Sequence, residues 1–213
     1  RKELEETKNI AKQIGARHLV IQTEETENKN YIKNPNNRCY YCKSELYAKL
    51  KIISEQLGIK NILNGTNLDD LGDYRPGLKA ADENNVISPL KDTELTKNEV
   101  RELAKHLGLE IWDKPSFPCL SSRVPYGSEI TLKKLSMIEE AENFLKDFGV
   151  RELRVRHFGG IARIEVNEAD KQIINGNFES IKNKFNDIGF SEIEISNFKS
   201  GSLNQVLNVR AEN

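Results

Sequence analysis

The three cysteines constrain the fold of this chain more than any other feature. Cys39 and Cys42 form a Cys-x-x-Cys pair and Cys119 lies far downstream, and the sequence contains no other cysteine. If the three thiolates meet at one centre, two distant segments must fold against each other. Three thiolates leave a tetrahedral or cubane site one protein ligand short, and an open position on a metal centre is where exogenous chemistry takes place.

Each cysteine has a distinctive local setting. Apolar residues at helical spacing from Ser44 to Gly58 predict a helix, which places Cys39 and Cys42 at its N-terminal end. The partial positive charge of a helix N-terminus favours the thiolate form that a metal needs. Three prolines and a glycine make the segment around Cys119 irregular but ordered. We therefore expect this thiol to be oriented rather than packed as a small buried apolar group.

Composition excludes several classes of function. The net charge of −1 offers no basic excess for nonspecific binding to nucleic acid or to a membrane surface. No apolar run approaches the ~18 residues of a membrane-spanning helix. An odd cysteine count without a signal peptide indicates a reducing compartment, so we expect a cytoplasmic protein. The chain begins at Arg1 and its one methionine is Met137, so we expect it to be part of a longer protein.

The first part of the chain predicts α/β structure with a parallel sheet. Helical spacing, a glycine and a short apolar strand follow one another repeatedly. A capping box at Thr96-x-x-Glu99 opens one of the helices. The expected elements are helices at Arg1–Gly15, Ser44–Gly58 and from Thr96 to Gly108, and strands at His18–Thr23 and Asn61–Thr66.

An acidic loop follows the second expected strand. Asn67, Asp69, Asp70 and Asp73 lie there, and ligands of α/β sheets bind where loops leave the carboxyl ends of strands. Oxygen ligands of this kind suit a Mg-nucleotide. A solvated acidic turn is the alternative.

The character of the chain changes between about residues 125 and 130, where we place a domain boundary that gives domains 1–127 and 128–213. Arg154 and Arg156 alternate on a strand and so share one face, as a phosphate-binding fork or as a solvated surface. An α-β-β-α-β module is expected from a helix at Thr131–Phe148, strands at Arg151–His157 and Ile161–Val166 around Phe158-Gly159-Gly160, a helix at Phe178–Ile188 and a strand at Glu192–Ser196.

Three motifs in order closely resemble the LarE-like sulfur transferases, which are PP-loop ATP pyrophosphatases. The motifs are Asn37-Arg-Cys-Tyr-Tyr-Cys-Lys43, Gly65-Thr-Asn-Leu-Asp-Asp-Leu-Gly-Asp-Tyr-Arg-Pro-Gly77 and Pro118-Cys-Leu-Ser-Ser-Arg-Val-Pro-Tyr-Gly127, and similarity continues through Arg151–Arg156 and Ser200–Leu207. The resemblance implies a parallel-sheet PP-loop domain, of the adenine nucleotide alpha hydrolase-like type, followed by a small α+β domain. The family's Ser-Gly-Gly-Val-Asp-Ser loop is absent from the sequence, so the first domain is expected to be incomplete at its N-terminus.

The resemblance also implies a reaction. ATP with Mg²⁺ would activate a carboxylate of a pyridinium mononucleotide as an acyl-adenylate, and sulfur would then form a thiocarboxylate for the nickel-pincer nucleotide cofactor. Residues implied to bind ATP or the substrate are Asn67, Asp69, Asp70, Ser122, Arg123, Arg154 and Arg156. The family resemblance further implies a homo-oligomer, by analogy a hexamer.

Two sulfur sources are known in this family, and the cysteine pattern distinguishes them. Members with one cysteine at the position of Cys119 sacrifice its sulfur and retain dehydroalanine. Members that also carry the Cys-x-x-Cys pair resemble [4Fe-4S] proteins, in which the fourth iron binds exogenous sulfide from a donor. This sequence has the second pattern, so we expect a [4Fe-4S] cluster on Cys39, Cys42 and Cys119, with Cys119 as the catalytic cysteine.

Two other functions fit part of the pattern. PP-loop enzymes with three cysteines and a cluster also thiolate tRNA, although the neutral net charge makes a nucleic-acid partner the weaker expectation. The three cysteines with His157 or His106 would instead suit a structural zinc in an interaction module. A thioredoxin-like role for the Cys-x-x-Cys pair fits the order of elements less well.

Overall fold

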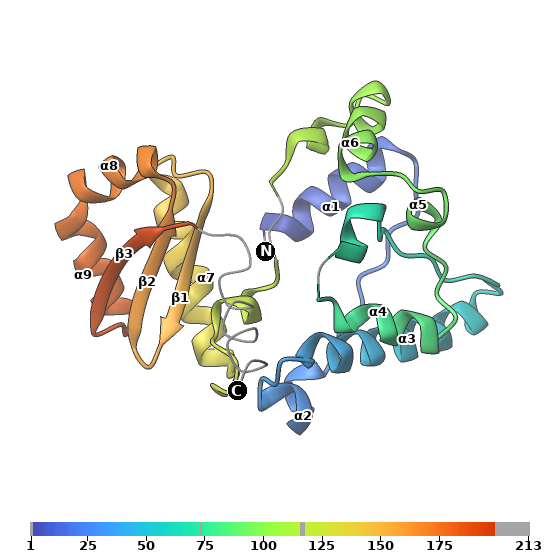
Figure 1. Cartoon of the computed structure of the whole chain (residues 1–213), viewed down its shortest axis with the longest axis horizontal. Coiled ribbons are helices and arrows are strands. Elements are labelled where there is room, and N and C mark those ends of the chain that lie inside the picture. The colour runs from blue at the N-terminus through green and yellow to red at the C-terminus, as the bar shows by residue number, and fades with distance from the viewer. Residues whose placement is uncertain (1, 73, 116–117, 199–213) are drawn as a thin grey trace. The chain divides into compact units, whose positions relative to one another are not determined.

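The chain folds into two compact units, each described by itself. The computed structural model describes residues 2–72, 74–115 and 118–198 (Figure 1). Unit 1 comprises Arg1–Glu24 and Cys42–Lys114, and unit 2 comprises Glu25–Tyr41 and Pro115–Asn213. The expected boundary near residues 125–130 lies within unit 2 and stays a prediction.

Unit 1 is mainly helical. Thr96 accepts from the backbone N–H of Glu99, and the Glu99 carboxylate accepts from the N–H of Thr96, so the expected capping box is confirmed. Its helices are α1 (Lys2–Gln13), most of α3 (Arg38–Gln56), α4 (Pro76–Glu83), α5 (Pro89–Asp92) and α6 (Lys97–His106), with 3-10 helices η2 (Leu68–Gly72) and η3 (Glu110–Asp113).

The parallel sheet expected in this part of the chain is mostly absent from the described residues. The segment 18–23 is described but forms no strand, so that prediction was wrong. The segment 61–66 contributes a single parallel bridge between Leu63 and Ile87. Both bridge residues are exposed, as are Leu19 and Val20. Strand propensity is local, but a ladder needs a neighbouring strand. Among the described residues, the segment 18–23 has no such neighbour and the segment 61–66 has only the bridge to Ile87.

Unit 2 contains a three-stranded sheet covered on one face by helices. The strand order is β1-β2-β3, with β1 and β2 antiparallel and β2 and β3 parallel. Its elements are η1 (Glu25–Glu27), α2 (Lys29–Ile32), η4 (Leu120–Arg123), α7 (Leu132–Asp147), β1 (Leu153–Phe158), β2 (Ile161–Val166), α8 (Glu168–Gly176), α9 (Phe178–Ile188) and β3 (Glu192–Asn197).

Alternation along the strands decides which side chains enter the core of unit 2. Leu153 and Val155 of β1 and Ile164 of β2 are fully buried with Leu145 of α7 and Phe185 of α9. The intervening residues of β1 and β2, which include Arg154 and Arg156, belong to the other face because successive side chains of a strand point to opposite faces. The core therefore fixes the orientation of the arginine-bearing face.

The expected α-β-β-α-β module is confirmed with one addition. The hairpin turns at Gly159 and Gly160, whose φ angles of 59° and 104° suit the two central residues of a tight turn. Helix α8, capped by the side chain of Asn167, was missed because its sequence offers few apolar residues at helical spacing. Among the described residues, no helix is both long and apolar enough to cross a membrane.

Candidate functional site

Cys119 is an exposed residue on a tightly held backbone segment of unit 2. It immediately precedes η4, and Arg123 at the end of η4 is only 1% exposed. The guanidinium Nη1 of Arg123 donates to the carbonyl oxygens of Pro118 and Cys119, at 2.5 and 3.3 Å, and to the hydroxyl of Ser122 at 3.1 Å. The backbone at Cys119 is therefore fixed from one side while the thiol stays accessible.

Arg123 is itself held by a buried carboxylate of α7. Nε and Nη2 of Arg123 donate to the two carboxylate oxygens of Glu142, at 2.8 and 3.1 Å. Glu142, 3% exposed, also accepts from the backbone N–H of Val155 at 3.0 Å. A two-pronged pair of this kind fixes orientation as well as charge. The Cys119 segment is thereby connected to α7 and to the edge of β1.

A second buried arginine contacts the same segment from the sheet. Arg156 of β1 donates from Nε to Glu165 of β2 at 2.7 Å and from Nη1 to the carbonyl oxygen of Ser122 at 2.9 Å. It is 2% exposed, so the solvated-surface interpretation of this residue was wrong. Its carbonyl contact makes Arg156 part of the support of the Cys119 segment.

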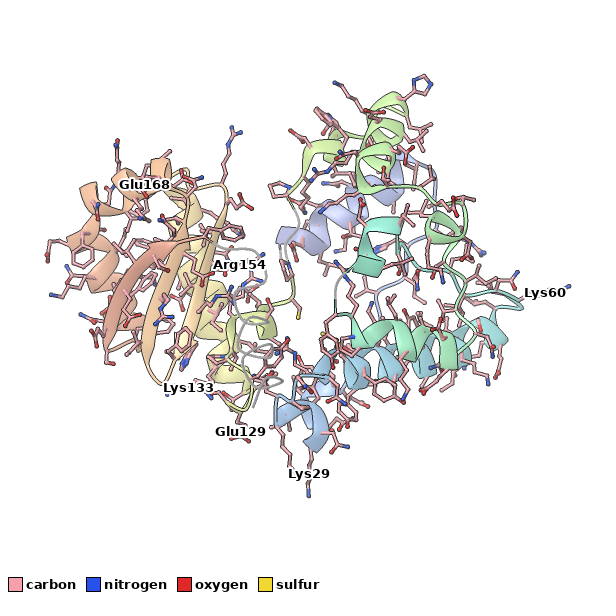
Figure 2. The ribbon with its side chains drawn as sticks, in the orientation of Figure 1. Lys29, Lys60, Glu129, Lys133, Arg154 and Glu168 are labelled. Carbon is pink, nitrogen blue, oxygen red and sulfur yellow. The ribbon has the colours of Figure 1, made fainter. Side chains whose placement is uncertain are left out.

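Arg154, which Figure 2 labels, is the most available of the three guanidinium groups, because Arg123 and Arg156 are almost fully buried. It is half-buried, its guanidinium carbon lies 4.5 Å from the ring centre of Phe198, and no described carboxylate forms an ion pair with it. Burial lowers the pKa of Arg154 below its ordinary value, and repulsion from Arg156 and Arg123 lowers the pKa further. The three guanidinium groups carry three positive charges, and the carboxylates of Glu142 and Glu165 balance two of them. The remaining positive charge suits an anion.

The segment that carries Cys39 is bonded to the same loop. Arg38, the first residue of α3, donates from Nη1 to the carbonyl oxygen of Ser121 at 2.9 Å. Cys39 and Cys42 are partly buried, and their spacing along α3 puts them on one helix face. As predicted, both lie at the N-terminal end of a helix. Cys39 and Cys119 thus belong to segments of unit 2 that are joined by a direct hydrogen bond.

The three-thiolate centre itself stays a prediction. Within the part of the chain that the structure describes, no three Cys, His, Asp or Glu side chains are grouped so as to hold a metal ion. The histidines of the zinc alternative have other surroundings. His157 is 6% exposed and lies against the ring of Phe190, and His106 is exposed at the end of α6.

The acidic loop of unit 1 uses its polar groups mainly for local structure. Asp69 accepts from the backbone N–H of Lys97 at the start of α6, at 2.7 Å. Asp70 accepts from the N–H of Asn67 at 3.1 Å and pairs with Arg75 at 2.9 Å. The Oδ1 atom of Asn67 is buried and accepts no hydrogen bond from the described residues. Asp73 of the same loop lies outside the described residues.

Several residues of this arrangement were missed from the sequence. Glu142 had a visible signal, because it occupies a helical position between Ile138 and Leu145 on the apolar face of α7. A carboxylate at such a position needs a buried cation. The sequence marks Arg38 only as a neighbour of the cysteines, and it marks Asn34 only by the proline that follows it.

The chain is similar in sequence to several known proteins. An uncharacterized protein of Synechocystis sp. is 42% identical over 209 residues, which is 96% of this chain and 78% of that protein. An uncharacterized protein of Methanocaldococcus jannaschii is 38% identical over 165 residues, which is 78% of this chain and 64% of that protein. No protein-family profile matches the chain.

A third relative has an assigned activity. The pyridinium-3,5-bisthiocarboxylic acid mononucleotide synthase of Lactiplantibacillus plantarum is 31% identical over 210 residues, which is 96% of this chain and 75% of that enzyme. The resemblance to this family seen in the motifs is therefore confirmed over nearly the whole chain. The chain belongs to the LarE-like family of pyridinium-3,5-bisthiocarboxylic acid mononucleotide synthases.

Proposed function

We propose that this chain is a sulfur transferase that converts a carboxylate of a pyridinium mononucleotide to a thiocarboxylate, for synthesis of the nickel-pincer nucleotide cofactor. The name of the L. plantarum relative supports the product class. The observation that carries the proposal is the position of Cys119. Its thiol is exposed, whereas the backbone that bears it is fixed by two buried arginines.

The proposed reaction has two steps. The substrate carboxylate attacks the α-phosphorus of ATP, pyrophosphate leaves, and an acyl-adenylate forms. A sulfur nucleophile then attacks the acyl carbon, and the bond to AMP breaks with its electron pair on the phosphate oxygen. Activation is needed because oxide is a poor leaving group from a carboxylate and AMP is a good one. The expected products are a thiocarboxylate, AMP and pyrophosphate.

Unit 1 is the proposed location of ATP with Mg²⁺, as part of a PP-loop domain. The parallel bridge between Leu63 and Ile87 and the loop that follows it support this assignment. The buried Oδ1 of Asn67 supports a ligand as well, because a buried acceptor without a donor is costly. Asp69 would contribute through Oδ1, which its contact to Lys97 leaves available. Asp70 would contribute by exchanging a contact, because its two oxygen atoms already accept from Asn67 and pair with Arg75.

Cys39, Cys42 and Cys119 are the proposed ligands of a [4Fe-4S] cluster. When bound, such a cluster would offer one iron without a protein ligand, where exogenous sulfide can be held. The residues of the chain have a separate task. Arg123 and Arg156 hold the carbonyl groups of the Cys119 segment, so the thiol meets an incoming group from a defined direction.

Arg154 is the proposed contact for the substrate phosphate, and the neighbouring Arg156, which holds the Ser122 carbonyl, adds positive charge to the same region. The Arg154→Ala variant should weaken mononucleotide binding, measured by calorimetric titration, and the loss should shrink at high salt because the contact is electrostatic. Lys171→Ala removes a partly buried cation, paired with Glu168, from α8 of the same unit and should leave the affinity unchanged. Equal affinities of the wild type and the Arg154→Ala variant would remove Arg154 from the substrate site.

The proposal is tested first by iron and acid-labile sulfide content after anaerobic reconstitution. We expect about four irons per chain, a brown protein, and loss of iron in each of the Cys39→Ala, Cys42→Ala and Cys119→Ala variants. Iron binding that survives the Cys119→Ala substitution would overturn the cluster. Colourless protein with stoichiometric zinc would overturn it as well.

The reaction is tested by incubation with ATP, sulfide and a pyridinium carboxylate mononucleotide. Mass spectrometry should detect the thiocarboxylate and an intact Cys119 after several turnovers. Conversion of Cys119 to dehydroalanine would show sacrificial sulfur transfer instead. Thiolation of tRNA, without thiolation of the mononucleotide, would replace the substrate assignment. Analytical ultracentrifugation of the same sample tests the expected homo-oligomer.

A further inference from the structure

A buried asparagine joins the two segments that carry Cys39 and Cys119. Asn34 is 0% exposed and has a left-handed backbone with φ of 53°. Its Nδ2 donates to the carbonyl oxygens of Val124, Pro125 and Ser128, at 3.2, 2.7 and 2.9 Å. Its own carbonyl oxygen accepts from the N–H of Gly127 at 2.9 Å. Asn34, which precedes α3 in the chain, thus holds the whole turn that follows η4.

Arg38 connects this asparagine to the Cys119 segment. Its Nη1 donates to Oδ1 of Asn34 at 2.5 Å and to the carbonyl oxygen of Ser121 at 2.9 Å. Its guanidinium carbon lies 5.6 Å from the ring centre of Tyr126, and the residue is 3% exposed. The bond to Ser121 joins positions that are 83 residues apart in sequence, next to Cys39 at one end and two residues after Cys119 at the other.

The charge of Arg38 is not neutralised by the described protein. No carboxylate in residues 2–72, 74–115 and 118–198 forms an ion pair with it, and its partners there are amide and carbonyl oxygens and an aromatic ring. A buried cation without an anion is costly. Since the next residue is Cys39, an anionic centre at the start of α3 would compensate this charge.

We propose that Asn34 and Arg38 are positioning residues that hold the Cys39 thiol in reach of the Cys119 thiol, so that both ligate one anionic metal centre. This inference rests on the proposed three-thiolate centre. Metal ligands must be placed within about 0.5 Å of their productive positions by a supporting set of contacts. Asn34 fixes the turn after η4, and Arg38 fixes η4 to the first turn of α3.

The first experiment measures the distance between the thiols without any metal. In a Cys42→Ser background, a short bismaleimide should join Cys39 to Cys119, and mass spectrometry of the digest quantifies the joined peptides. Asn34→Gly preserves the left-handed backbone and removes only the side chain. Arg38→Met removes the charge and the hydrogen bonds, whereas Arg38→Lys retains the charge. Lys33→Met, which removes an exposed cation beside Asn34, is the matched control.

The rate of cross-linking should fall about tenfold in the Arg38→Met and Asn34→Gly proteins, the effect expected from loss of a charge-assisted hydrogen bond. The Lys33→Met protein should react like its parent. Circular dichroism and thermal unfolding identify variants that retain the fold, and Arg38→Lys carries the test if Arg38→Met does not fold. Equal rates in the folded Arg38 and Asn34 variants would overturn the proposal.

The second experiment measures iron and acid-labile sulfide in the three-cysteine protein with the same substitutions. We expect the iron content to fall in the Arg38→Met protein, to recover in part in the Arg38→Lys protein and to be unchanged in the Lys33→Met protein. A wild type that binds iron on all three cysteines, with equal iron in every variant, would overturn the positioning role and leave the proposed function intact. A wild type that binds no iron would overturn the proposed three-thiolate centre, and the cross-linking rates would still decide whether Asn34 and Arg38 position the thiols.

Discussion

In the Cys119 segment of unit 2, buried guanidinium groups hold backbone carbonyls, whereas in the acidic loop of unit 1 carboxylates at or near the surface hold backbone amides. Arg123 and Arg156 are 1% and 2% exposed. Asp69 is exposed and Asp70 is partly buried. The hydrogen bonds in the two regions are similar in length, at 2.5–3.3 Å and 2.7–3.1 Å. The two regions therefore differ in the solvent exposure of their charged side chains rather than in the lengths of their hydrogen bonds.

That difference determines what each region can do. A buried charge that loses its partner cannot turn to water, so the arrangement around Cys119 is expected to be rigid. An exposed carboxylate can exchange a backbone contact for water or for a bound cation at small cost. The first region suits the support of a reactive group, and the second suits a loop that reorganises around a ligand.

The largest effect is expected from removal of Glu142. The Glu142→Ala substitution leaves Arg123 buried without its carboxylate and Val155 without an acceptor. The free energy of unfolding, measured by urea denaturation, should fall by about 3–5 kcal/mol. Glu140→Ala, two residues away on α7, removes a carboxylate from an exposed pair with Lys184 and should cost less than about 1 kcal/mol. Similar losses in the two variants would abolish the contrast between buried and exposed pairs.

A smaller loss is expected when Arg156 becomes lysine. Lysine keeps the charge near Glu165 but cannot also reach the carbonyl of Ser122 in the same geometry. The free energy of unfolding should fall by about 1–3 kcal/mol. Arg154→Lys, on the same strand, removes no described hydrogen bond and should change stability by less than about 0.5 kcal/mol. A larger effect at position 154 than at position 156 would reverse the assigned roles.

The interior of unit 2 should also disfavour an unpaired charge on His157. Burial lowers the pKa of this imidazole below 6.5, its own backbone hydrogen bond raises the pKa, and Lys134 lowers it. Because the unfolded chain binds the proton more readily, stability is fully present above pH 6.5 and is lost as the pH falls from 6.5 through the lower folded pKa. The slope for one proton is at most about 1.4 kcal/mol per pH unit.

The measurement compares unfolding free energies of the wild type and a His157→Phe variant between pH 7.5 and pH 5. The difference between the two should grow as the pH falls, since phenylalanine has no proton to bind. His106→Phe, at an exposed position, should follow the wild type. Parallel curves for the wild type and the His157→Phe variant would mean that His157 gains a proton partner inside the folded unit.

Local signals were sufficient for much of the fold. The capping box at Thr96, the Gly159-Gly160 hairpin and helix α9 depend on residues close together in sequence, and all were predicted. Strands at 18–23 and 61–66 depend on partners elsewhere, and one is absent and the other is reduced to a bridge. The apolar pattern of a segment indicates that it can form a strand. Whether the strand forms depends on a neighbouring strand with which it can pair.

The candidate site likewise contains residues that the sequence predicts and contacts that it does not. The cysteines, Ser122, Arg123, Arg154 and Arg156 were named from sequence, because thiols and clustered arginines are chemically conspicuous. The sequence could not show that Arg156 is buried and Arg154 is available. Alternation along a strand predicts which face a side chain lies on, but not which other segments pack against that face. Nor could the sequence reveal Asn34, whose role follows from three carbonyl groups about 90 residues away in sequence.

The smallest effect is expected in the acidic loop, from Asp69→Ala. Asp69 accepts from Lys97 at the start of α6, where Thr96 and Glu99 already supply a capping box. Its loss should lower the free energy of unfolding by about 0.5–1 kcal/mol, the usual range for one exposed cap. Thr96→Ala removes the main cap and should cost more. If Asp69 also faces Mg-ATP, the variant should weaken nucleotide binding by far more than it weakens folding, because a loop carboxylate that is cheap to release is one that a cation can recruit. A loss of affinity no larger than the loss of stability would make Asp69 a helix cap and nothing else.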